Sequence, residues 1–252
     1  MGASPREEEG SLIMTTVLIT GASSGIGEAL AKSWADDGHT VIACGRDIER
    51  LSALSQYSPH ITVRQFDMTN SQACHAALAD CRVNLAVLCA GTCEYIDHGV
   101  IDPERVSRVM NTNFIGPINC LSALQGQLVP GSRVVLVSSM AHWLPFPRAE
   151  AYGASKAALS WFAESLRLDW EPKGIAVTVV SPGFVDTPLT RKNDFSMPGL
   201  VTVEQAVTAI RRGITAGKSH IAFPAGFGAL LRLLSWLPGI AQRALLRRMV
   251  RP

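Results

Sequence analysis

The chain has few charged side chains, and their scarcity excludes several kinds of protein. Only 17% of its 252 residues are charged, 47% are apolar, and the net charge is +2. Disordered segments and nucleic-acid-binding tails carry far more charge than this. We therefore expect a globular chain that does not bind nucleic acid, with a core large enough for one α/β domain whose sheet is buried on both faces.

C-x-x-C pairs are absent among the six cysteines, and most of these cysteines lie in apolar stretches. Cys89 and Cys93 form a lone C-x-x-x-C pattern, without the further ligands that a zinc site needs. The sequence therefore predicts no metal site. Reduced thiols are typical of cytoplasmic proteins, and the cytoplasm is the location that we expect.

The beginning of the chain has no apolar run, so it does not form a secretory signal. A myristoylation signal is excluded as well, because Arg6 stands where that signal needs serine or threonine. The first predicted strand begins shortly after Met14. We therefore expect residues 1–13 to be a disordered leader and residues 14–224 to be the folded domain.

Apolar, strand-like runs alternate with segments of helix length along the rest of the chain, which is typical of a parallel sheet with helices on both faces. No internal repeat or linker marks a second domain. The sequence thus predicts a doubly wound, Rossmann-type α/β fold. The expected strands are residues 16–20, 40–43, 61–65, 84–89, 133–138, 175–181 and 220–223.

A glycine-rich turn connects the first predicted strand to the first helix, with its glycines in the spacing G-x-x-x-G-x-G. Its candidate binding residues are Gly21, Ser23, Ser24, Gly25, Ile26 and Gly27. Glycines let the backbone approach a pyrophosphate, and the helix N-terminus offers free N–H groups and a positive dipole end. The turn indicates a nucleotide site, although glycine-rich turns also serve purely structural purposes.

The end of the second strand indicates which nicotinamide cofactor to expect. A ribose 2′-hydroxyl, as in NAD, is bound there by an acidic residue, whereas the 2′-phosphate of NADP needs a cation. The sequence has Gly45 and Arg46 at this point and no acid before Asp47. Arg46 therefore favours NADP(H). The alternative is that Arg46 is only a solvated loop charge.

Tyr152 and Lys156 are four residues apart at the start of a predicted helix that runs to about Trp170, so their side chains share one face. A lysine cation beside a tyrosine is expected to lower the phenol pKa from about 10 toward neutrality, as a general acid–base requires. Ser138 and Ser139 end a strand before Tyr152 and bring a hydroxyl to the same edge of the sheet. These residues predict an acid–base site.

Together these motifs resemble the short-chain dehydrogenase/reductase family, from Thr16 to about Phe223. The resemblance implies an oxidoreductase that uses NADP(H) to interconvert a carbonyl group and an alcohol, with the hydride carried by the cofactor. Further motifs of the family occur in the same order along this chain. They are Asp67 after the third strand, Ala90-Gly91 after the fourth, Asn113, Pro182-Gly183 and Thr187.

The resemblance also implies roles for individual residues. Tyr152 would exchange a proton with the substrate oxygen, and Ser139 would polarise that oxygen. Lys156 would lower the tyrosine pKa and bind the nicotinamide ribose, and Asn113 would hold a water in the proton relay. Further cofactor contacts are implied for Asp67, Ala90, Gly91, Pro182, Gly183, Val185 and Thr187.

Structural alternatives stay open at several of these positions. Ser138 could be the better-placed hydroxyl, and Asn113 could be a buried residue that bends a helix. Asp67 could cap a helix, and Thr187 could cap the turn that follows it. The chain departs from the family pattern at Cys89, where many relatives have asparagine, and we expect this change to reduce local rigidity rather than activity.

Two segments near the C-terminus have distinct expected roles. Residues 188–200 are expected to form a lid over the substrate. Residues 225–252 are apolar and basic, and neither of their apolar stretches reaches the about 20 residues of a membrane-spanning helix. We therefore expect an amphipathic helical tail that either contacts an anionic membrane surface peripherally or packs on another subunit.

The preferred interpretation is an NADP(H)-dependent enzyme that reduces a small carbonyl compound of apolar or lipid-like character, or oxidises the alcohol. A non-catalytic NADP(H)-binding sensor or scaffold on the same fold is the alternative. An enzyme that uses the bound cofactor for epimerisation or dehydration is a further one. The resemblance also implies self-association, as a homodimer or homotetramer.

Overall fold

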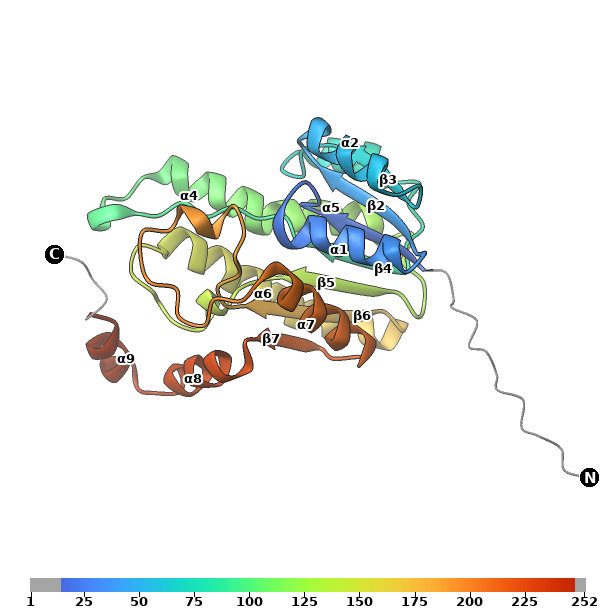
Figure 1. The fold of residues 1–252 in the computed structure, drawn as a ribbon. Helices are drawn as coiled ribbons and strands as arrows, with labels where there is room; N and C mark the ends of the chain where they lie inside the picture. The colour runs from blue at the N-terminus through green and yellow to red at the C-terminus, as the bar shows by residue number, and fades with distance from the viewer. Residues whose placement is uncertain (1–14, 248–252) are drawn as a thin grey trace, which may run out of the picture.

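Residues 15–247 are described by the computed structural model, and they form a seven-stranded sheet between two layers of helices (Figure 1). All neighbouring strands are parallel, in the order β3-β2-β1-β4-β5-β6-β7. The predicted Rossmann-type fold is confirmed. The leader expected for residues 1–13 lies outside the described residues. The strands are β1 (Thr16–Thr20), β2 (Thr40–Gly45), β3 (Ile61–Gln65), β4 (Leu85–Leu88), β5 (Arg133–Val137), β6 (Ala176–Pro182) and β7 (His220–Phe223).

Several helices begin at a polar residue whose side chain accepts a hydrogen bond from a backbone N–H of the first turn, as Asp47, Asn70, Asp102 and Thr202 do. The α-helices are α1 (Gly25–Asp36), α2 (Ile48–Tyr57), α3 (Ser71–Leu78), α4 (Pro103–Met110), α5 (Gly116–Leu124), α6 (Glu150–Trp170), α7 (Val203–Thr215), α8 (Ala225–Ser235) and α9 (Gly239–Leu246). The shorter helical turns are η1 (Asp97–Gly99), η2 (Asn111–Ile115), η3 (Met140–His142), η4 (Glu171–Lys173) and η5 (Thr190–Lys192).

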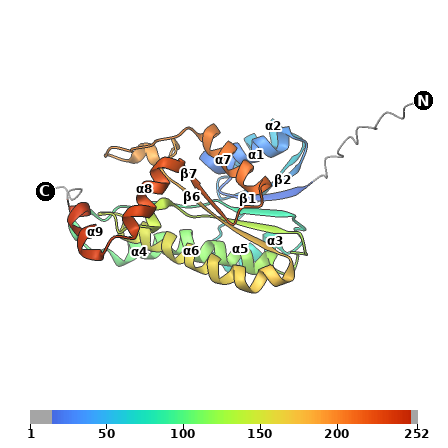
Figure 2. The same cartoon turned by 90° about the horizontal axis from the view of Figure 1, so that it is seen from below.

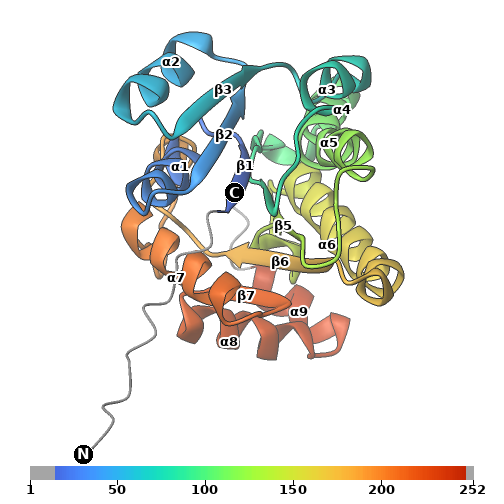
Figure 3. The same cartoon turned by 90° about the vertical axis from the view of Figure 1, so that its right-hand side faces the viewer.

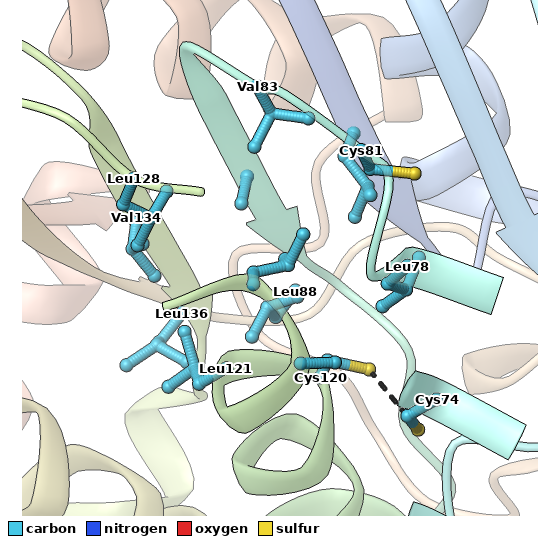
Figure 4. Packing of buried hydrophobic residues seen from close by; sticks show 14 of the residues in the cluster. Cys74, Leu78, Cys81, Val83, Leu88, Cys120, Leu121, Leu128, Val134 and Leu136 are labelled. Atoms are coloured by element: carbon cyan, nitrogen blue, oxygen red, sulfur yellow. Dashed lines mark hydrogen bonds between the residues drawn. The ribbon is translucent and has the colours of Figure 1, made fainter. Parts of the chain in front are cut away.

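Helices cover both faces of the sheet (Figure 2), and the apolar side chains under each layer form a separate core. One core lies against α3, α5 and α6, where the sulfur atoms of Cys74 and Cys120 are 4.0 Å apart (Figure 4). The other lies against α1, α2 and α7 and includes Ile19, Leu30 and Val207, all buried. Because both faces are covered, the strands are apolar along their length, which explains the continuous apolar runs of the sequence.

The strand order reverses direction at the centre of the sheet. From β1 the chain continues to β2 and β3 on one side, and then returns to β4, β5, β6 and β7 on the other. The loops that follow β1 and β4 therefore diverge, and a crevice opens at the carboxyl ends of these two strands. This is where the fold places a ligand site.

Helix α8 packs beside β7, and α9 follows it at the same end of the molecule (Figures 1 and 3). Leu231 of α8 and Leu246 of α9 are buried in a small apolar cluster with Met140 and Leu144 from the loop after β5. The opposite surface of the two helices exposes large apolar side chains, among them Trp236 at 78%. Within residues 15–247, no helix has the length and apolar character needed to cross a membrane.

Leu231→Ala should lower the free energy of unfolding by about 2–5 kcal/mol, because it removes a fully packed side chain and leaves a cavity. Leu230→Ala is the matched control: Leu230 is 51% exposed and Leu231 only 6%, so the control should stay within about 0.5 kcal/mol of the wild type. Urea denaturation measures both. Equal losses in the two variants would show that α8 does not dock through Leu231.

Candidate active site

A cavity of about 440 Å³ lies at the carboxyl ends of the central strands. Loops from both halves of the sheet line it, and so does the first part of α6. All residues that the sequence analysis assigned to the cofactor line this cavity, as do Ser139, Tyr152 and Lys156. Asn113 is the one predicted site residue that does not.

The glycine turn forms the floor of the cavity at the N-terminus of α1. Gly21 has a φ of +69°, and a Cβ there would lie 2.7 Å from the Cα of Ala90. A Cβ on Gly27 would overlap the carbonyl of Gly21. Only glycine fits these positions, so the backbone N–H groups and the helix dipole reach the cavity without side chains in between. This cradle fits a pyrophosphate.

Arg46 stands at the end of β2, beside the cavity. Its side chain is 71% exposed, and its nearest acidic group is Asp67 at 3.9 Å. Burial opposes the ionisation of Asp67, but hydrogen bonds from Thr69 and the charge of Arg46 outweigh it and lower the pKa of this carboxyl. The guanidinium is thus held near the cavity by a long, exposed ion pair, which leaves it able to bind a phosphate.

Lys156, Tyr152 and Ser139 lie together on the opposite wall. The ammonium group of Lys156 is buried and donates to the carbonyl of Val137 at 2.9 Å. Its Nζ atom is 5.9 Å from the centre of the Tyr152 ring. The Ser139 hydroxyl interacts with the phenol of Tyr152. The predicted pairing of hydroxyl, phenol and ammonium is therefore present as one group of side chains.

Burial dominates the ionisation of both groups. It raises the pKa of Tyr152 to about 12, against an opposing hydrogen bond with Ser139. It also lowers the pKa of Lys156 to about 8, against the opposing effect of Cys89 and Cys93. The sequence led us to expect that Lys156 lowers the phenol pKa, because it shows the lysine charge and not the burial of both side chains. In this structure Tyr152 is a protonated phenol at neutral pH, which is the form that gives a proton to a carbonyl.

Asn113 lies behind this wall, in the π-helical turn η2. Its side chain is fully buried: Oδ1 accepts from the Thr92 backbone N–H at 2.8 Å, and Nδ2 donates to the Thr92 carbonyl and to Ser155 Oγ. Asn113 therefore fastens the loop after β4 to α6 at Ser155, three residues after Tyr152. Its role in holding a relay water stays a prediction.

The two serines at the end of β5 have different surroundings. The hydroxyl of Ser138 is buried behind the cavity, where it donates to the carbonyl of Lys156 at 3.0 Å and lies 2.7 Å from Ser160 Oγ. His142 contacts both of these hydroxyls through Nδ1. Ser139 alone has its hydroxyl against Tyr152. The geometry thus favours Ser139 as the group that faces a substrate, and Ser138 as a support for α6.

Thr187 and Asp67 combine a position in the cavity wall with a local structural contact. Thr187 packs on Gly25 and exchanges hydrogen bonds with Thr190 in the turn η5, as the capping alternative predicted. Asp67 accepts from the backbone and hydroxyl of Thr69, whereas the cap of α3 is Asn70 rather than Asp67. Neither local contact prevents a role in binding.

Sequence reasoning did not assign several residues of the site, among them Thr20, Arg50 and Thr69. Thr20 accepts hydrogen bonds from the backbone N–H groups of Cys89 and Ala90, at 3.1 and 3.3 Å, and so joins β1 to the loop after β4. Arg50 and Thr69 also line the cavity. The signal for Arg50 was present, since it follows the helix cap Asp47 by one turn and adds a second cation near Arg46.

A glycine-lined cavity at the strand reversal of a doubly wound sheet, with a buried serine, tyrosine and lysine on its wall, defines a dinucleotide-binding oxidoreductase. The comparison with known proteins narrows this class. Residues 15–196 match the family described as short chain dehydrogenase, and the chain belongs to this family. It is thus a dehydrogenase/reductase that uses a nicotinamide cofactor.

Relatives with similar sequences include three oxidoreductases. The chain is 36% identical to an uncharacterized oxidoreductase of Myxococcus xanthus over 93% of its own length and 97% of that protein. It is 35% identical to dehydrogenase/reductase SDR family member 7B of Xenopus laevis, over 69% of its length and 59% of the relative. It is 31% identical to 11-beta-hydroxysteroid dehydrogenase-like 4A of Arabidopsis thaliana, over 92% of its own length and 82% of the relative.

Solved structures agree on the fold. A short chain dehydrogenase from Burkholderia cenocepacia in complex with NADP has a TM-score of 0.82 and 25% identity, and covers 95% of this chain and 98% of its own. A short-chain dehydrogenase from Sphingobium yanoikuyae in complex with NADPH has a TM-score of 0.77 and 26% identity. The match covers 90% of this chain and 97% of the Sphingobium protein.

The rate of carbonyl reduction should be constant below pH 8 and fall above it. Lys156, with a pKa lowered to about 8, loses its charge as the pH rises through that value, whereas Tyr152, with a pKa of about 12, keeps its proton. A pH profile of kcat/KM for the free enzyme measures this. Lys156→Arg carries a permanent charge, so its residual activity should not fall near pH 8. The same midpoint in both proteins would assign the fall to another group.

Proposed function

We propose that this chain is an NADP(H)-dependent carbonyl reductase, or in the reverse direction an alcohol dehydrogenase, with an apolar or lipid-like substrate. One observation carries the proposal: Ser139, Tyr152 and Lys156 line the same cavity as the glycine turn and Arg46. An acid–base group and a nucleotide cradle in one space are what hydride transfer to a carbonyl requires. The NADP and NADPH bound by the two similar structures support the choice of cofactor.

The cavity offers a partner for each part of NADP(H). The glycine turn and the N-terminus of α1 would hold the pyrophosphate, and Arg46 with Arg50 the 2′-phosphate. Asp67 would lie near the adenine. The residues assigned to the nicotinamide half are Ala90, Gly91, Lys156, Pro182, Gly183, Val185 and Thr187.

The protein's own contribution to the reaction is a proton and its placement. The hydride that the carbonyl carbon receives would come from the reduced nicotinamide cofactor, when it is bound in this cavity. Tyr152 gives its phenol proton to the carbonyl oxygen, so that C=O becomes CH–OH, and Ser139 donates a hydrogen bond that orients the same oxygen. The Lys156 charge stabilises the phenolate that Tyr152 leaves behind. Asn113, buried against Ser155 of α6, would support a water that returns the proton.

Two features support an apolar substrate. Relatives from plants carry the name 11-beta-hydroxysteroid dehydrogenase, at 30–33% identity. In this chain, aromatic side chains gather beside the cavity, where Phe184 contacts both Phe195 and Phe227. The alternative of a non-catalytic NADP(H) sensor is disfavoured by the retained Ser139, Tyr152 and Lys156.

Purified protein should oxidise NADPH in the presence of apolar ketones or aldehydes, as measured by the loss of nicotinamide absorbance, and should use NADH poorly. Arg46→Ser should raise KM for NADPH by about tenfold, the value of one charge-assisted contact, and leave KM for NADH nearly unchanged. Tyr152→Phe should lower kcat by about 10²–10⁴-fold, because it lacks the proton donor.

The controls separate binding from chemistry. Tyr152→Phe should still bind NADPH with the wild-type affinity, measured by cofactor fluorescence. Arg191→Ser removes a cation that pairs with Asp186 and is not among the residues that line the cavity, so the variant's cofactor preference should equal that of the wild type. Tight binding of NADPH by the wild type without turnover of any carbonyl would favour the sensor instead.

We further propose that the enzyme works in the cytoplasm as a homodimer or homotetramer. An apolar surface on α6 supports self-association, since Trp161 is 79% and Leu168 75% exposed there. Side chains of this size rarely stand fully exposed together on a monomer without a partner.

A peripheral contact with an anionic membrane is proposed for α8 and α9. Their outer surface exposes Leu233, Trp236 and Ile240 at 60%, 78% and 76%. No acidic residue follows Glu204, while arginines flank the apolar side chains. Exposed apolar groups with cations and no anions suit the interface of a bilayer that contains negatively charged lipids.

The combined change of Leu233, Trp236 and Ile240 to serine should abolish co-sedimentation with phosphatidylserine vesicles, while folding is preserved because these side chains are exposed. Val100→Ser removes an equally exposed apolar group elsewhere and should sediment like the wild type. Binding should weaken at high salt. If wild type and triple variant sediment alike but differ in molecular mass, the surface is a subunit contact instead.

A further inference from the structure

Arg148 has an unusual backbone conformation just before α6. Its φ is +66°, in the left-handed region that residues with a large side chain rarely adopt. Its carbonyl accepts a hydrogen bond from the backbone N–H of Ile96 at 2.9 Å, so the strained segment is fixed to the loop after β4. Strained residues persist where the surroundings hold them, and they are concentrated at functional sites.

The side chain of Arg148 joins its own loop to two other segments of the chain. Its Nε donates to Asp97 at 2.6 Å and its Nη1 to Asp194 at 2.8 Å. The guanidinium carbon also lies 5.0 Å from the centre of the Tyr95 ring. Asp194 belongs to the predicted lid, residues 188–200, whereas Tyr95 and Asp97 belong to the loop after β4. Only the flat, forked guanidinium can bridge two carboxylates and stack on a ring at once.

A row of aromatic rings begins at the same place. The Tyr95 and Phe195 rings meet edge to face at 5.7 Å, and Phe195 meets Phe184 at 6.0 Å. Phe184 in turn lies 6.3 Å from Phe227 of α8. The hydroxyl of Tyr95 donates to Asn193 at 2.7 Å, a second link between the loop and the lid. The rings therefore come from the loop, the lid, the end of β6 and α8.

This aromatic row, Tyr95–Phe195–Phe184–Phe227, lies beside the catalytic group at one end and beside the cofactor cavity at the other. At one end, the pKa of Tyr95 is raised mainly by burial, and the nearby phenol of Tyr152 adds to the rise. At the other end, Phe227 lies against Gly183, which lines the cofactor cavity. A carbonyl compound that reaches Tyr152 therefore has the aromatic row as a neighbour.

We propose that the aromatic row binds the body of flat, ring-containing carbonyl substrates, and that Arg148 is the positioning residue that assembles it by fastening the lid to the loop after β4. This inference rests on the proposed reductase function. Without the guanidinium, Asp97 and Asp194 would come close together as like charges, and the lid carrying Phe195 would lose this link to the loop after β4. The row would then be incomplete.

Arg148→Asn is the informative variant, because asparagine tolerates the left-handed conformation and lacks the fork. It should raise KM for a two-ring ketone by about tenfold or more through the misplaced wall. For a small aliphatic aldehyde, kcat/KM should change less than about twofold, since that substrate does not reach the row. NADPH affinity should equal that of the wild type. Arg148→Lys keeps the positive charge but cannot bridge both carboxylates. Its KM for the two-ring ketone should lie between those of the wild type and Arg148→Asn.

Arg108→Gln is the matched control. Arg108 forms a forked pair with Glu94 of the same loop, at 3.2 and 2.8 Å, and among residues 15–247 no hydrogen bond or ion pair joins its side chain to the lid. It should leave KM for the ring ketone unchanged. A similar rise of KM in this variant, or an equal rise for the small aldehyde in Arg148→Asn, would overturn the proposal.

Limited trypsin digestion tests how firmly the lid is attached, and it does so without an activity measurement. Arg191 and Lys192 lie in the lid, and cleavage after them should be several-fold faster in Arg148→Asn than in the wild type, at unchanged melting temperature. If Arg148→Asn does not fold, Asp194→Asn breaks the same bridge from the lid side and should behave alike. Unchanged lid cleavage would refute the attachment. Faster cleavage in a protein that turns over no carbonyl would refute only the reductase function.

Discussion

The hydroxyl of Thr20 is the contact on which the site depends. It accepts hydrogen bonds from two successive backbone N–H groups at the start of the loop after β4, and so ties the end of β1 to its neighbour where the strand order reverses. Because Gly21 follows directly and approaches Ala90, the glycine turn and this loop become opposite walls of one crevice. Cys89, the position where the family resemblance led us to expect asparagine, takes part in this connection through its backbone N–H.

The sequence predicted most of the fold, because the strands are buried on both faces. Three predicted strands, β1, β3 and β7, match the structure in full, and the others differ only at their ends. Residues at the ends of parallel strands meet at one edge, so Arg46, Ser139 and Gly183 could be assigned to one site without any contact information. The choice between Ser138 and Ser139 needed the structure, since both are polar residues at the same strand end.

Burial is what sequence reasoning could not supply. The spacing of Tyr152 and Lys156 predicts that they share a helix face, but their pKa values depend on how completely α6 covers them. The same limit applies to α8: its apolar residues surround the helix, so nothing in the sequence tells that Leu231 is buried and Leu230 exposed. Residues 225–247, expected as a tail, contribute a buried face to the loop after β5 as well as an exposed one.

The loop after β5 contacts both regions whose burial the sequence could not reveal, the catalytic group and α8. It begins at Ser139, carries His142 against the hydroxyl of Ser138, and continues into the cluster that buries Leu231. It ends at Arg148, whose left-handed backbone turns the chain into α6 shortly before Tyr152. One segment therefore connects the catalytic hydroxyl, the docking site of α8 and the start of the catalytic helix. A change in how α8 packs would be felt at both catalytic positions, because a packed interior transmits displacement rather than absorbing it.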